Sequence, residues 1–306
     1  MEGIVIKSTG SWFTVRKPDG DKIECKIKGA FRLKGIDSSN PVAVGDHVDY
    51  ELEEDGVGVI SNIHERTNYI IRRATKLSAR SHIIASNIDC AYLMVTISSP
   101  VTPLLFIDRF LVTAEAYHIP VEILINKTDL IEKDQKKELD KMIAIYESAG
   151  YKCQPISVLK NEGIAEIFKQ LAGKVNLIAG NSGVGKSSLL NRLDPDWNLK
   201  IAEMSAHDTG KHTTTFAEMY ELKNETFVID TPGLKSFGTY DLEKEELSHR
   251  FPEMRSRMKD CKFSNCLHIN EPNCAVIEAV EKGEIAESRY KNYLNIYNSD
   301  ETENYR

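Results

Sequence analysis

The glycine-rich stretch GNSGVGKSS, residues 180–188, fits the pattern G-x-x-x-x-G-K-[ST] without a mismatch. It follows the apolar run VNLIA and opens a helix-forming stretch, which is the context that a phosphate-binding loop requires. Glycines let backbone N–H groups turn toward phosphates, and the N-terminus of the following helix adds partial positive charge. Lys186 would reach the β- and γ-phosphates, and the Ser187 hydroxyl would ligate Mg²⁺. The predicted phosphate-binding residues are Gly180, Asn181, Ser182, Gly183, Val184, Gly185, Lys186, Ser187 and Ser188.

A second motif, NKTD at 126–129, ends the apolar run VEILI. Guanine presents its N1–H and 2-amino donors side by side, and the Asp129 carboxylate can accept from both, whereas adenine offers neither donor there. Asn126 would brace the loop, and the Lys127 stem would lie on the face of the base. Together with Thr128, these residues are predicted to bind guanine. The stretch PISV at 155–158 ends the next strand, and it either touches the base through its backbone or is a plain strand end.

Two stretches further along the chain have the character of nucleotide-sensing loops. DTPG at 230–233 follows the apolar run ETFVI, so Asp230 would hold Mg²⁺ through a water and Gly233 would present its N–H to the γ-phosphate. The run KHTTT at 211–215 lies between the glycine-rich loop and DTPG, where a switch loop offers a threonine to Mg²⁺. The sequence leaves open which of Thr213, Thr214 and Thr215 does so.

The group that activates water is not the usual one. Many GTP-hydrolysing enzymes place a glutamine directly after the DxxG glycine to orient the attacking water, and here that position is Leu234. We therefore expect slow intrinsic hydrolysis. His212, beside the threonine run, is the candidate catalytic group that positions the water, and the alternative is a solvated loop histidine. Related enzymes that use a potassium ion instead carry asparagine where this loop has Gly183, which disfavours that route.

The cysteines near the C-terminal end have the spacing of a metal site. Cys261-x4-Cys266-x-His268-x5-Cys274 places three soft thiolates and one imidazole within one short segment, which suits tetrahedral Zn²⁺. Four protein ligands leave no open position, so the predicted role is structural, with the metal supplying folding energy to a loop that has little core. The alternative is three buried cysteines and an exposed histidine. Six cysteines in a chain of this kind do not suggest a disulfide framework.

The elements that would position these residues change character along the chain. Residues 1–66 contain five short apolar or alternating runs separated by turn signals, which predicts a small β-barrel, either an OB-fold or an unspecialised β-domain. From residue 83, apolar strands alternate with helices expected at 104–118, 134–149 and 162–172, which predicts a doubly wound α/β sheet. After residue 236 the pattern is helical and polar.

The order of the two nucleotide motifs is reversed relative to most GTP-binding domains, because NKTD precedes the glycine-rich loop. Such a pocket is assembled from loops on one edge of a sheet, so the order of these loops along the chain is immaterial if the strands still pair correctly. Domain termini often lie close together, which makes permutation tolerable. We infer that the domain is circularly permuted.

The composition is that of a globular protein and argues against some classes of function. With 306 residues, 41% apolar and 28% charged, the chain is long enough for two or three ordinary globular domains. A net charge of −7 argues against a uniformly basic nucleic-acid binder. The sequence has no apolar run long enough to span a membrane and no signal-peptide pattern at its start, so we expect a cytoplasmic monomer with no membrane partner.

The motif order NKTD, PISV, GNSGVGKS, KHTTT, DTPG resembles that of circularly permuted GTPases, and over essentially all 306 residues the chain resembles the ribosome small-subunit-dependent GTPase A (RsgA) family. The resemblance implies an N-terminal OB-fold (1–66), a central α/β P-loop GTPase domain (67–236) and a C-terminal helical zinc-binding domain (237–306). It also implies GTP hydrolysis stimulated by the 30S subunit, a role in late subunit maturation and contact with 16S rRNA. The zinc spacing and the candidate His212 agree with the family.

The sequence is also compatible with other functions. The chain could be a permuted GTPase acting on the large subunit or another RNA, or a GTP-gated binding module whose hydrolysis is incidental. Candidate RNA-binding charges do not lie in the N-terminal segment, since residues 1–66 hold nine Lys/Arg against twelve Asp/Glu. They form two groups, one at Arg66, Arg72, Arg73, Lys76 and Arg80 and one at Arg250, Arg255, Arg257, Lys259 and Lys262, and a solvated face is the alternative for the second. Trp12, Phe13 and Phe31 either stack on bases or pack in the core.

Overall fold

The computed structural model describes residues 1–27, 41–73, 81–196, 218–223, 225–230 and 243–299. The chain divides into two compact units. The first, unit 1, comprises residues 1–91, 167–178 and 190–234, and the second, unit 2, comprises residues 92–166, 179–189 and 235–306. None of the described helices is long and apolar enough to cross a membrane.

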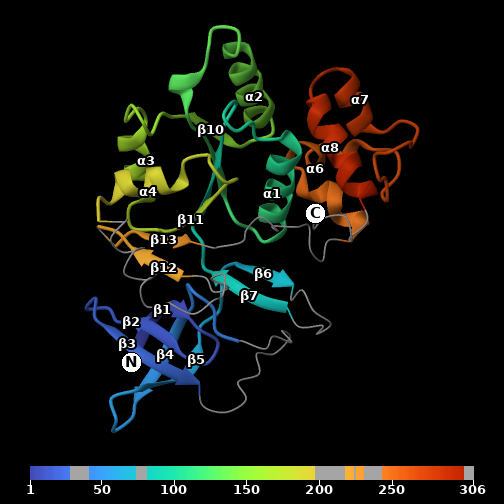
Figure 1. The fold of residues 1–306 in the computed structure, drawn as a ribbon. Coiled ribbons are helices and arrows are strands. Elements are labelled where there is room, and N and C mark those ends of the chain that lie inside the picture. The colour runs from blue at the N-terminus through green and yellow to red at the C-terminus, as the bar shows by residue number, and fades with distance from the viewer. Residues whose placement is uncertain (28–40, 74–80, 197–217, 224, 231–242, 300–306) are drawn as a thin grey trace. The chain divides into compact units, whose positions relative to one another are not determined.

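The N-terminal part of unit 1 is a closed five-stranded barrel (Figure 1). Its strands are β1 (Glu2–Ser8), β2 (Phe13–Arg16), β3 (Lys22–Ile27), β4 (His47–Leu52) and β5 (Gly58–Ile63). They follow the order β1-β2-β3-β5-β4, and β4 also pairs with β1, which closes the barrel and removes its open edges. The alternating runs point Val5, Phe13, Val15 and Tyr50 into a common core. The predicted β-barrel is confirmed.

Unit 1 continues beyond the barrel in strands that the sequence predicted only in part. The further strands are β6 (Tyr69–Arg73), β7 (Ser81–Ser86), β11 (Val175–Ala179), β12 (Glu218–Glu221) and β13 (Phe227–Asp230). β11 and β13 run parallel, β12 is antiparallel to β13, and β12 also pairs with β1 through Lys7 and Glu218. The antiparallel β6–β7 hairpin was not predicted. Its strand sequences YIIRR and SHIIAS are short and flank a basic stretch, so they give a weak periodic signal.

Unit 2 contains the strands and helices around the two nucleotide motifs. Its strands are β8 (Cys90–Val95), β9 (Val121–Ile125) and β10 (Lys152–Pro155), with β9 and β10 parallel. Its helices include α1 (Leu104–Ala116), α2 (Lys136–Ser148), α3 (Ile164–Leu171) and α4 (Lys186–Leu193), of which α3 and α4 continue into unit 1, and a short 3-10 helix η1 (Thr128–Leu130). On α1 the buried residues Ile107, Phe110, Leu111 and Ala114 recur at helical spacing. The predicted alternation of strands and helices is confirmed.

The C-terminal part of unit 2 is helical. Its elements are η3 (Lys244–Arg250), α6 (Pro252–Arg255), η4 (Met258–Asp260), α7 (Ala275–Glu281) and α8 (Glu287–Asn298). They share a core in which Phe251, Met254, Tyr293 and Ile296 are buried together with Val112 of α1, so α1 lies against this part of the chain (Figure 1).

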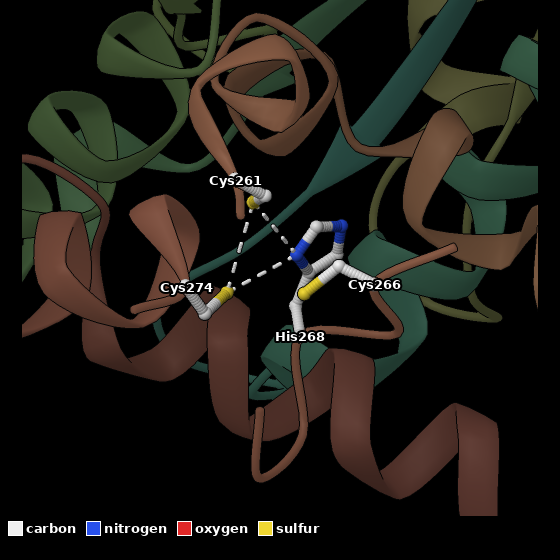
Figure 2. Close-up of side chains that lie close together, drawn as sticks. All are labelled: Cys261, Cys266, His268 and Cys274. Atoms are coloured by element: carbon white, nitrogen blue, oxygen red, sulfur yellow. Dashed lines mark hydrogen bonds between the residues drawn. The ribbon is translucent and has the colours of Figure 1, made fainter. Parts of the chain in front are cut away.

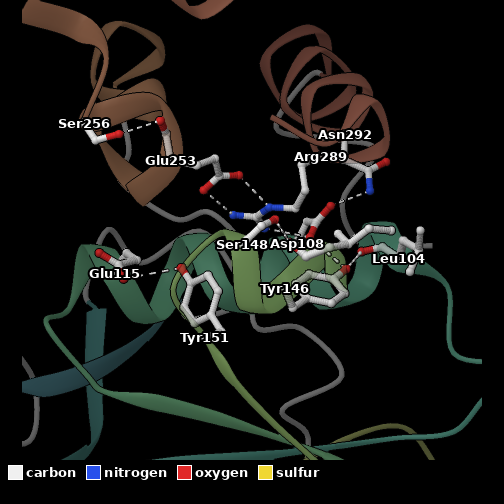
Figure 3. Close-up of polar contacts among 11 residues, drawn as sticks. Leu104, Asp108, Glu115, Tyr146, Ser148, Tyr151, Glu253, Ser256, Arg289 and Asn292 are labelled. Carbon is white, nitrogen blue, oxygen red and sulfur yellow. Dashed lines mark hydrogen bonds and ion pairs between the residues drawn. The ribbon is translucent and has the colours of Figure 1, made fainter. Parts of the chain in front are cut away.

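A buried polar network joins α8 to α1 (Figure 3). Arg289 of α8 donates to Asp108 of α1 at 2.7 Å and to both carboxylate oxygens of Glu253 at 2.7 and 3.1 Å. Asn292 and Tyr146 donate to the same Asp108 carboxylate at 2.5 and 3.0 Å. Burial opposes the charge on Arg289, but Asp108 and Glu253 more than offset it and raise the pKa of the guanidinium. The C-terminal helices are thus fixed to α1 by a desolvated charge network.

Candidate nucleotide and metal sites

The glycine-rich loop lies between β11 and α4, as the sequence predicts. Gly180 and Gly185 have backbone φ angles of +143° and +104°, which side chains disfavour. A Cβ atom on Gly180 would lie 2.3 Å from the Met94 carbonyl oxygen, and one on Gly185 would lie 2.4 Å from the Asn126 amide nitrogen. Both glycines are therefore required by close packing. Ser187 and Ser188 are exposed in the first turn of α4, where a bound anion would meet the helix N-terminus.

Asn126 joins the base-recognition loop to the glycine-rich loop. Its side chain is buried, and its Nδ2 donates to the Val184 carbonyl oxygen at 2.8 Å while its Oδ1 accepts from the Val158 N–H at 3.1 Å. The two motifs, at least 51 residues apart in the sequence (180 − 129), thus share one hydrogen-bonded side chain. Asn126 also fixes the loop that follows β10. This geometry agrees with the bracing role predicted for this residue.

The two lysines of the site are folded onto backbone carbonyls. Lys186 Nζ donates to the carbonyl oxygens of Gly180 and Asn181 at 2.6 and 2.9 Å, so its ammonium lies over the glycine-rich loop. Lys127, in the left-handed region with φ +65°, donates to the Ser99 carbonyl oxygen. Each ammonium is therefore held by backbone carbonyls within unit 2.

The PISV stretch lies against the NKTD loop. Ser157 Oγ donates to the Asp129 carboxylate at 2.5 Å, and Thr128 donates through both its hydroxyl and its N–H to the Ile156 carbonyl oxygen. Ser157 thus orients the carboxylate that is predicted to read guanine. Sequence reasoning considered only backbone contact for this stretch and missed the serine. The available signal was a small hydroxyl residue at a strand end, next to the aspartate's loop.

The remaining predicted nucleotide residues belong to the KHTTT and DTPG stretches. Asp230 is the last residue of β13, where its motif requires it to be. His212, Thr213, Thr214, Thr215 and Gly233 lie outside the described residues. The structure therefore brings together NKTD, PISV and the glycine-rich loop, and it leaves the switch residues as sequence-based predictions.

The predicted metal ligands converge at the C-terminal end of the chain (Figure 2). The Sγ atoms of Cys261, Cys266 and Cys274 and a ring nitrogen of His268 all lie within 4.8 Å of one another. His268 Nδ1 is 3.2 Å from Cys274 Sγ and 3.6 Å from Cys261 Sγ, and these two sulfurs are 4.0 Å apart. A tetrahedron with Zn–S of about 2.3 Å and Zn–N of about 2.0 Å needs S···N near 3.5 Å and S···S near 3.8 Å. The four residues fit one zinc ion, with Nδ1 as the histidine ligand.

The burial of this cluster sets its protonation in the absence of a cation. Burial raises the pKa of Cys266 to about 12 and raises that of Cys274, which keeps both thiols neutral without a cation nearby. Burial lowers the pKa of His268, so its imidazole is neutral at pH 7 and available as a ligand. Within the described part of the chain, His268 Nε2 is buried without a hydrogen-bond partner. The alternative of three buried cysteines beside an exposed histidine is wrong in two respects, because His268 is fully buried and Cys261 is only half-buried.

Several of the arginines that the sequence offers as RNA contacts form ion pairs with carboxylates of the same chain. Arg66 forms two hydrogen bonds of 2.6 Å with Asp46, and the two side chains are 8% and 0% exposed, so Arg66 is a structural ion-pair partner within unit 1 and not a surface charge. Arg250, Arg255 and Arg257 each pair with a glutamate at 2.8 to 3.1 Å. The ammonium of Lys262 lies 5.4 Å from the ring centre of Phe263. Of the aromatic candidates, Phe13 is in the barrel core, Trp12 is 46% exposed and Phe31 lies outside the described residues.

A parallel sheet edge with a glycine-rich phosphate loop and an NKxD loop bridged by one asparagine defines a guanine-nucleotide-binding P-loop domain, here in permuted order. Comparison with known proteins identifies its family. The model of the RsgA GTPase matches residues 63–240, and the model of the RsgA N-terminal domain matches residues 2–60. The chain belongs to the RsgA GTPase family, whose members are GTP-hydrolysing enzymes.

Relatives and solved structures cover nearly the whole chain. Small ribosomal subunit biogenesis GTPase RsgA of Bacteroides fragilis is 52% identical over 100% of this chain and 99% of its own length, and that of Christiangramia forsetii is 50% identical over 100% and 98%. The crystal structure of YjeQ from Thermotoga maritima aligns with a TM-score of 0.78 at 37% identity, covering 97% of this chain and 96% of that one. The crystal structure of YloQ, described as a circularly permuted GTPase, aligns with a TM-score of 0.75 at 33% identity, covering 97% and 93%. The predicted family and the predicted permutation are confirmed.

Proposed function

We propose that this chain is a GTPase that binds the small (30S) ribosomal subunit and assists its late maturation, with GTP hydrolysis stimulated by the subunit and driving release. The observation that carries the GTP-binding part of the proposal is Asn126, whose side chain joins the predicted guanine-reading loop to the glycine-rich loop at 2.8 Å. Relatives that are 50–52% identical over the full chain are named small ribosomal subunit biogenesis GTPases, which supports the choice of partner.

In this proposal GTP binds with Mg²⁺ at the glycine-rich loop. Lys186 leaves the Gly180 carbonyl for the β- and γ-phosphates, Ser187 ligates Mg²⁺, and Asp129 accepts from guanine while Ser157 holds its carboxylate. Asp230, Gly233 and one threonine of 213–215 complete the γ-phosphate side. The support for these roles is the motif spacing together with the contacts of the first group of residues.

Water activation is assigned to His212. Leu234 occupies the position of the usual water-orienting glutamine and has no polar group for the task. His212 precedes the threonine run in the sequence and can orient water through either ring nitrogen. Stimulation by the subunit then corresponds to placement of this histidine beside the attacking water.

One structural zinc is assigned to Cys261, Cys266, His268 and Cys274. The donor set and its spacing fit Zn²⁺, and four protein ligands leave no position for a reacting water. When bound, zinc would link Cys261, which follows η4, to Cys274, which precedes α7, through the loop that carries His268. Its contribution is to stability rather than to hydrolysis.

The remaining parts of the proposal are a cytoplasmic monomer that contacts 16S rRNA and three domains, 1–66, 67–236 and 237–306. Support for the domain boundaries comes from the barrel, which ends with β5 at Ile63, and from the helical elements that begin at Lys244. Support for RNA contact is weaker than the sequence suggested, because Arg66 is buried and three other arginines are paired.

The test is GTP turnover by the purified protein alone, with isolated 30S subunits and with isolated 50S subunits. Strong stimulation by 30S alone, abolished in Lys186→Ala, is the expected result. Stimulation by 50S alone would favour a large-subunit GTPase. Tight nucleotide-dependent binding to 30S without stimulation would favour a GTP-gated binding module, and no effect of either subunit would refute the proposal.

A further inference from the structure

In the short loop that carries His268, backbone N–H and C=O groups form hydrogen bonds with side chains. The N–H groups of Leu267, Ile269 and Asn270 all donate to the carboxylate of Glu271, at 2.7, 2.8 and 3.0 Å. Three N–H donors, on both sides of His268, therefore share one anionic acceptor.

The carbonyl groups of the same loop are held from the other side by α8. The Tyr290 hydroxyl donates to the His268 carbonyl oxygen at 2.8 Å, and the Tyr293 hydroxyl donates to the Leu267 carbonyl oxygen. His268 itself has φ +59°, a left-handed conformation that is uncommon for residues other than glycine. The loop itself forms no helix or strand. These side chains therefore provide the backbone hydrogen bonds that secondary structure would otherwise supply.

Glu271 is not one of the metal ligands. Among the described residues, the group of ligand atoms within 4.8 Å of one another contains three cysteines and His268 and does not include Glu271. Each of its two oxygens is instead used by the loop backbone, Oε1 by Leu267 and Oε2 by Ile269 and Asn270. An arrangement of successive N–H groups around one carboxylate is a backbone nest whose anion is supplied by the chain itself.

We propose that Glu271 is the positioning residue of the zinc centre: its carboxylate gathers the N–H groups on both sides of His268 and aims Nδ1 at the Cys261 and Cys274 sulfurs, with Tyr290 and Tyr293 fixing the opposite face of the loop. This inference rests on the proposed zinc centre. Because metal affinity depends on ligands already being in place, loss of Glu271 raises the cost of assembling the site when zinc binds.

The test uses Glu271→Gln in the full-length protein. Glutamine has the same length but presents an NH₂ group where one carboxylate oxygen accepts, so at least one N–H donor of the loop faces another donor. The matched control is Glu278→Gln, which removes the same charge from a glutamate on α7 whose side chain is 61% exposed and paired with Lys282. Zinc affinity is measured by competition with a chromophoric chelator, and ligand geometry is measured by the absorption bands of the Co²⁺-substituted protein.

We expect Glu271→Gln to bind zinc about 10- to 100-fold more weakly than the wild type, with altered Co²⁺ bands, and Glu278→Gln to match the wild type. Equal affinities of Glu271→Gln and the wild type would overturn the inference while leaving the zinc centre standing. A wild-type protein that binds no zinc would overturn both.

A second pair of variants covers the case in which Glu271→Gln fails to fold, judged by circular dichroism. Tyr290→Phe deletes the hydroxyl that donates to the His268 carbonyl, and Tyr297→Phe deletes a hydroxyl on the same face of α8 that makes none of these loop contacts. Tyr290→Phe is expected to weaken zinc binding several-fold relative to Tyr297→Phe. If the two tyrosine variants bind zinc equally, the loop is not positioned by these contacts and the inference fails.

Discussion

Arg289 offers the sharpest test of how the C-terminal helices are held. Its side chain is 1% exposed and contacts two carboxylates, Asp108 at 1% and Glu253 at 7% exposure. Arg289→Met keeps much of the apolar stem but leaves both carboxylates buried without their cation. Breaking a buried ion pair by removing one partner costs about 3–5 kcal/mol. At about 2–4 °C per kcal/mol for a unit of this size, the melting temperature should fall by about 6–20 °C.

The assay is urea unfolding of the full-length protein followed by circular dichroism, with amide hydrogen exchange on peptides from α8 and α1 to localise the loss. Lys291→Met is the matched control, because Lys291 lies on the same helix and pairs with Glu287 at 2.7 Å with the two side chains 64% and 71% exposed. Such a surface pair contributes little to stability, because both charges stay solvated and are screened by salt. The control should therefore unfold like the wild type.

A third variant separates loss of charge balance from loss of packing. Arg289→Met combined with Asp108→Asn and Glu253→Gln leaves no unpaired buried charge, so it should be more stable than Arg289→Met alone. If Arg289→Met lies within about 1 kcal/mol of the wild type, or if the triple variant is less stable than the single one, the reasoning from buried charge is refuted.

Three further predictions concern the nucleotide and metal sites. Asn126→Ala strands the Val184 carbonyl and the Val158 N–H, so GDP affinity measured with a fluorescent analogue should fall about 10- to 100-fold, and unchanged affinity would show that the bridge is dispensable. His212→Ala should lower 30S-stimulated turnover at least about 100-fold without changing GDP affinity, whereas a solvated histidine would leave turnover unaltered. Burial keeps the Cys266 and Cys274 thiols protonated at neutral pH, the pKa of Cys266 being about 12, so zinc binding releases a proton from each. Zinc affinity should therefore fall at least about 100-fold from pH 8 to pH 7, and a pH-independent affinity would contradict binding of zinc through these two thiols.

Local sequence patterns were sufficient for the parts of the fold that follow from short-range physics. The alternating runs of the barrel, the apolar strands of the central region and the glycine-rich loop between β11 and α4 each carry their own periodicity or turn chemistry. Cysteine spacing likewise predicted the metal cluster, since all four ligands lie within one short segment.

Contacts between distant segments were not predictable in this way. In the sequence, Arg66 has the pattern of a free positive charge. In the structure it pairs with buried Asp46, 20 residues upstream. Arg289 and Asp108 are 181 residues apart, and no periodicity links them. Ser157 supports Asp129 only because β9 and β10 lie side by side. Charge counts overestimated the free basic surface because a sequence does not show which charges are paired in the fold.

The network around Arg289 limits how far bound GDP or GTP can change the position of the C-terminal helices on α1. In the permuted order the DTPG stretch leads directly toward η3, so reordering of that stretch around a γ-phosphate could pull on the C-terminal part of the chain. Undocking α8 from α1 would separate Arg289 from Asp108 and expose the core that Val112 shares with the C-terminal helices. A nucleotide shifts such an equilibrium only by its differential affinity for the two states. We therefore expect α8 to stay on α1 in both states, with amide exchange in α8 equal for the GDP- and GTP-analogue-bound protein. Faster α8 exchange in one state would show that the nucleotide supplies enough energy to break the network, and that the helices move away from α1.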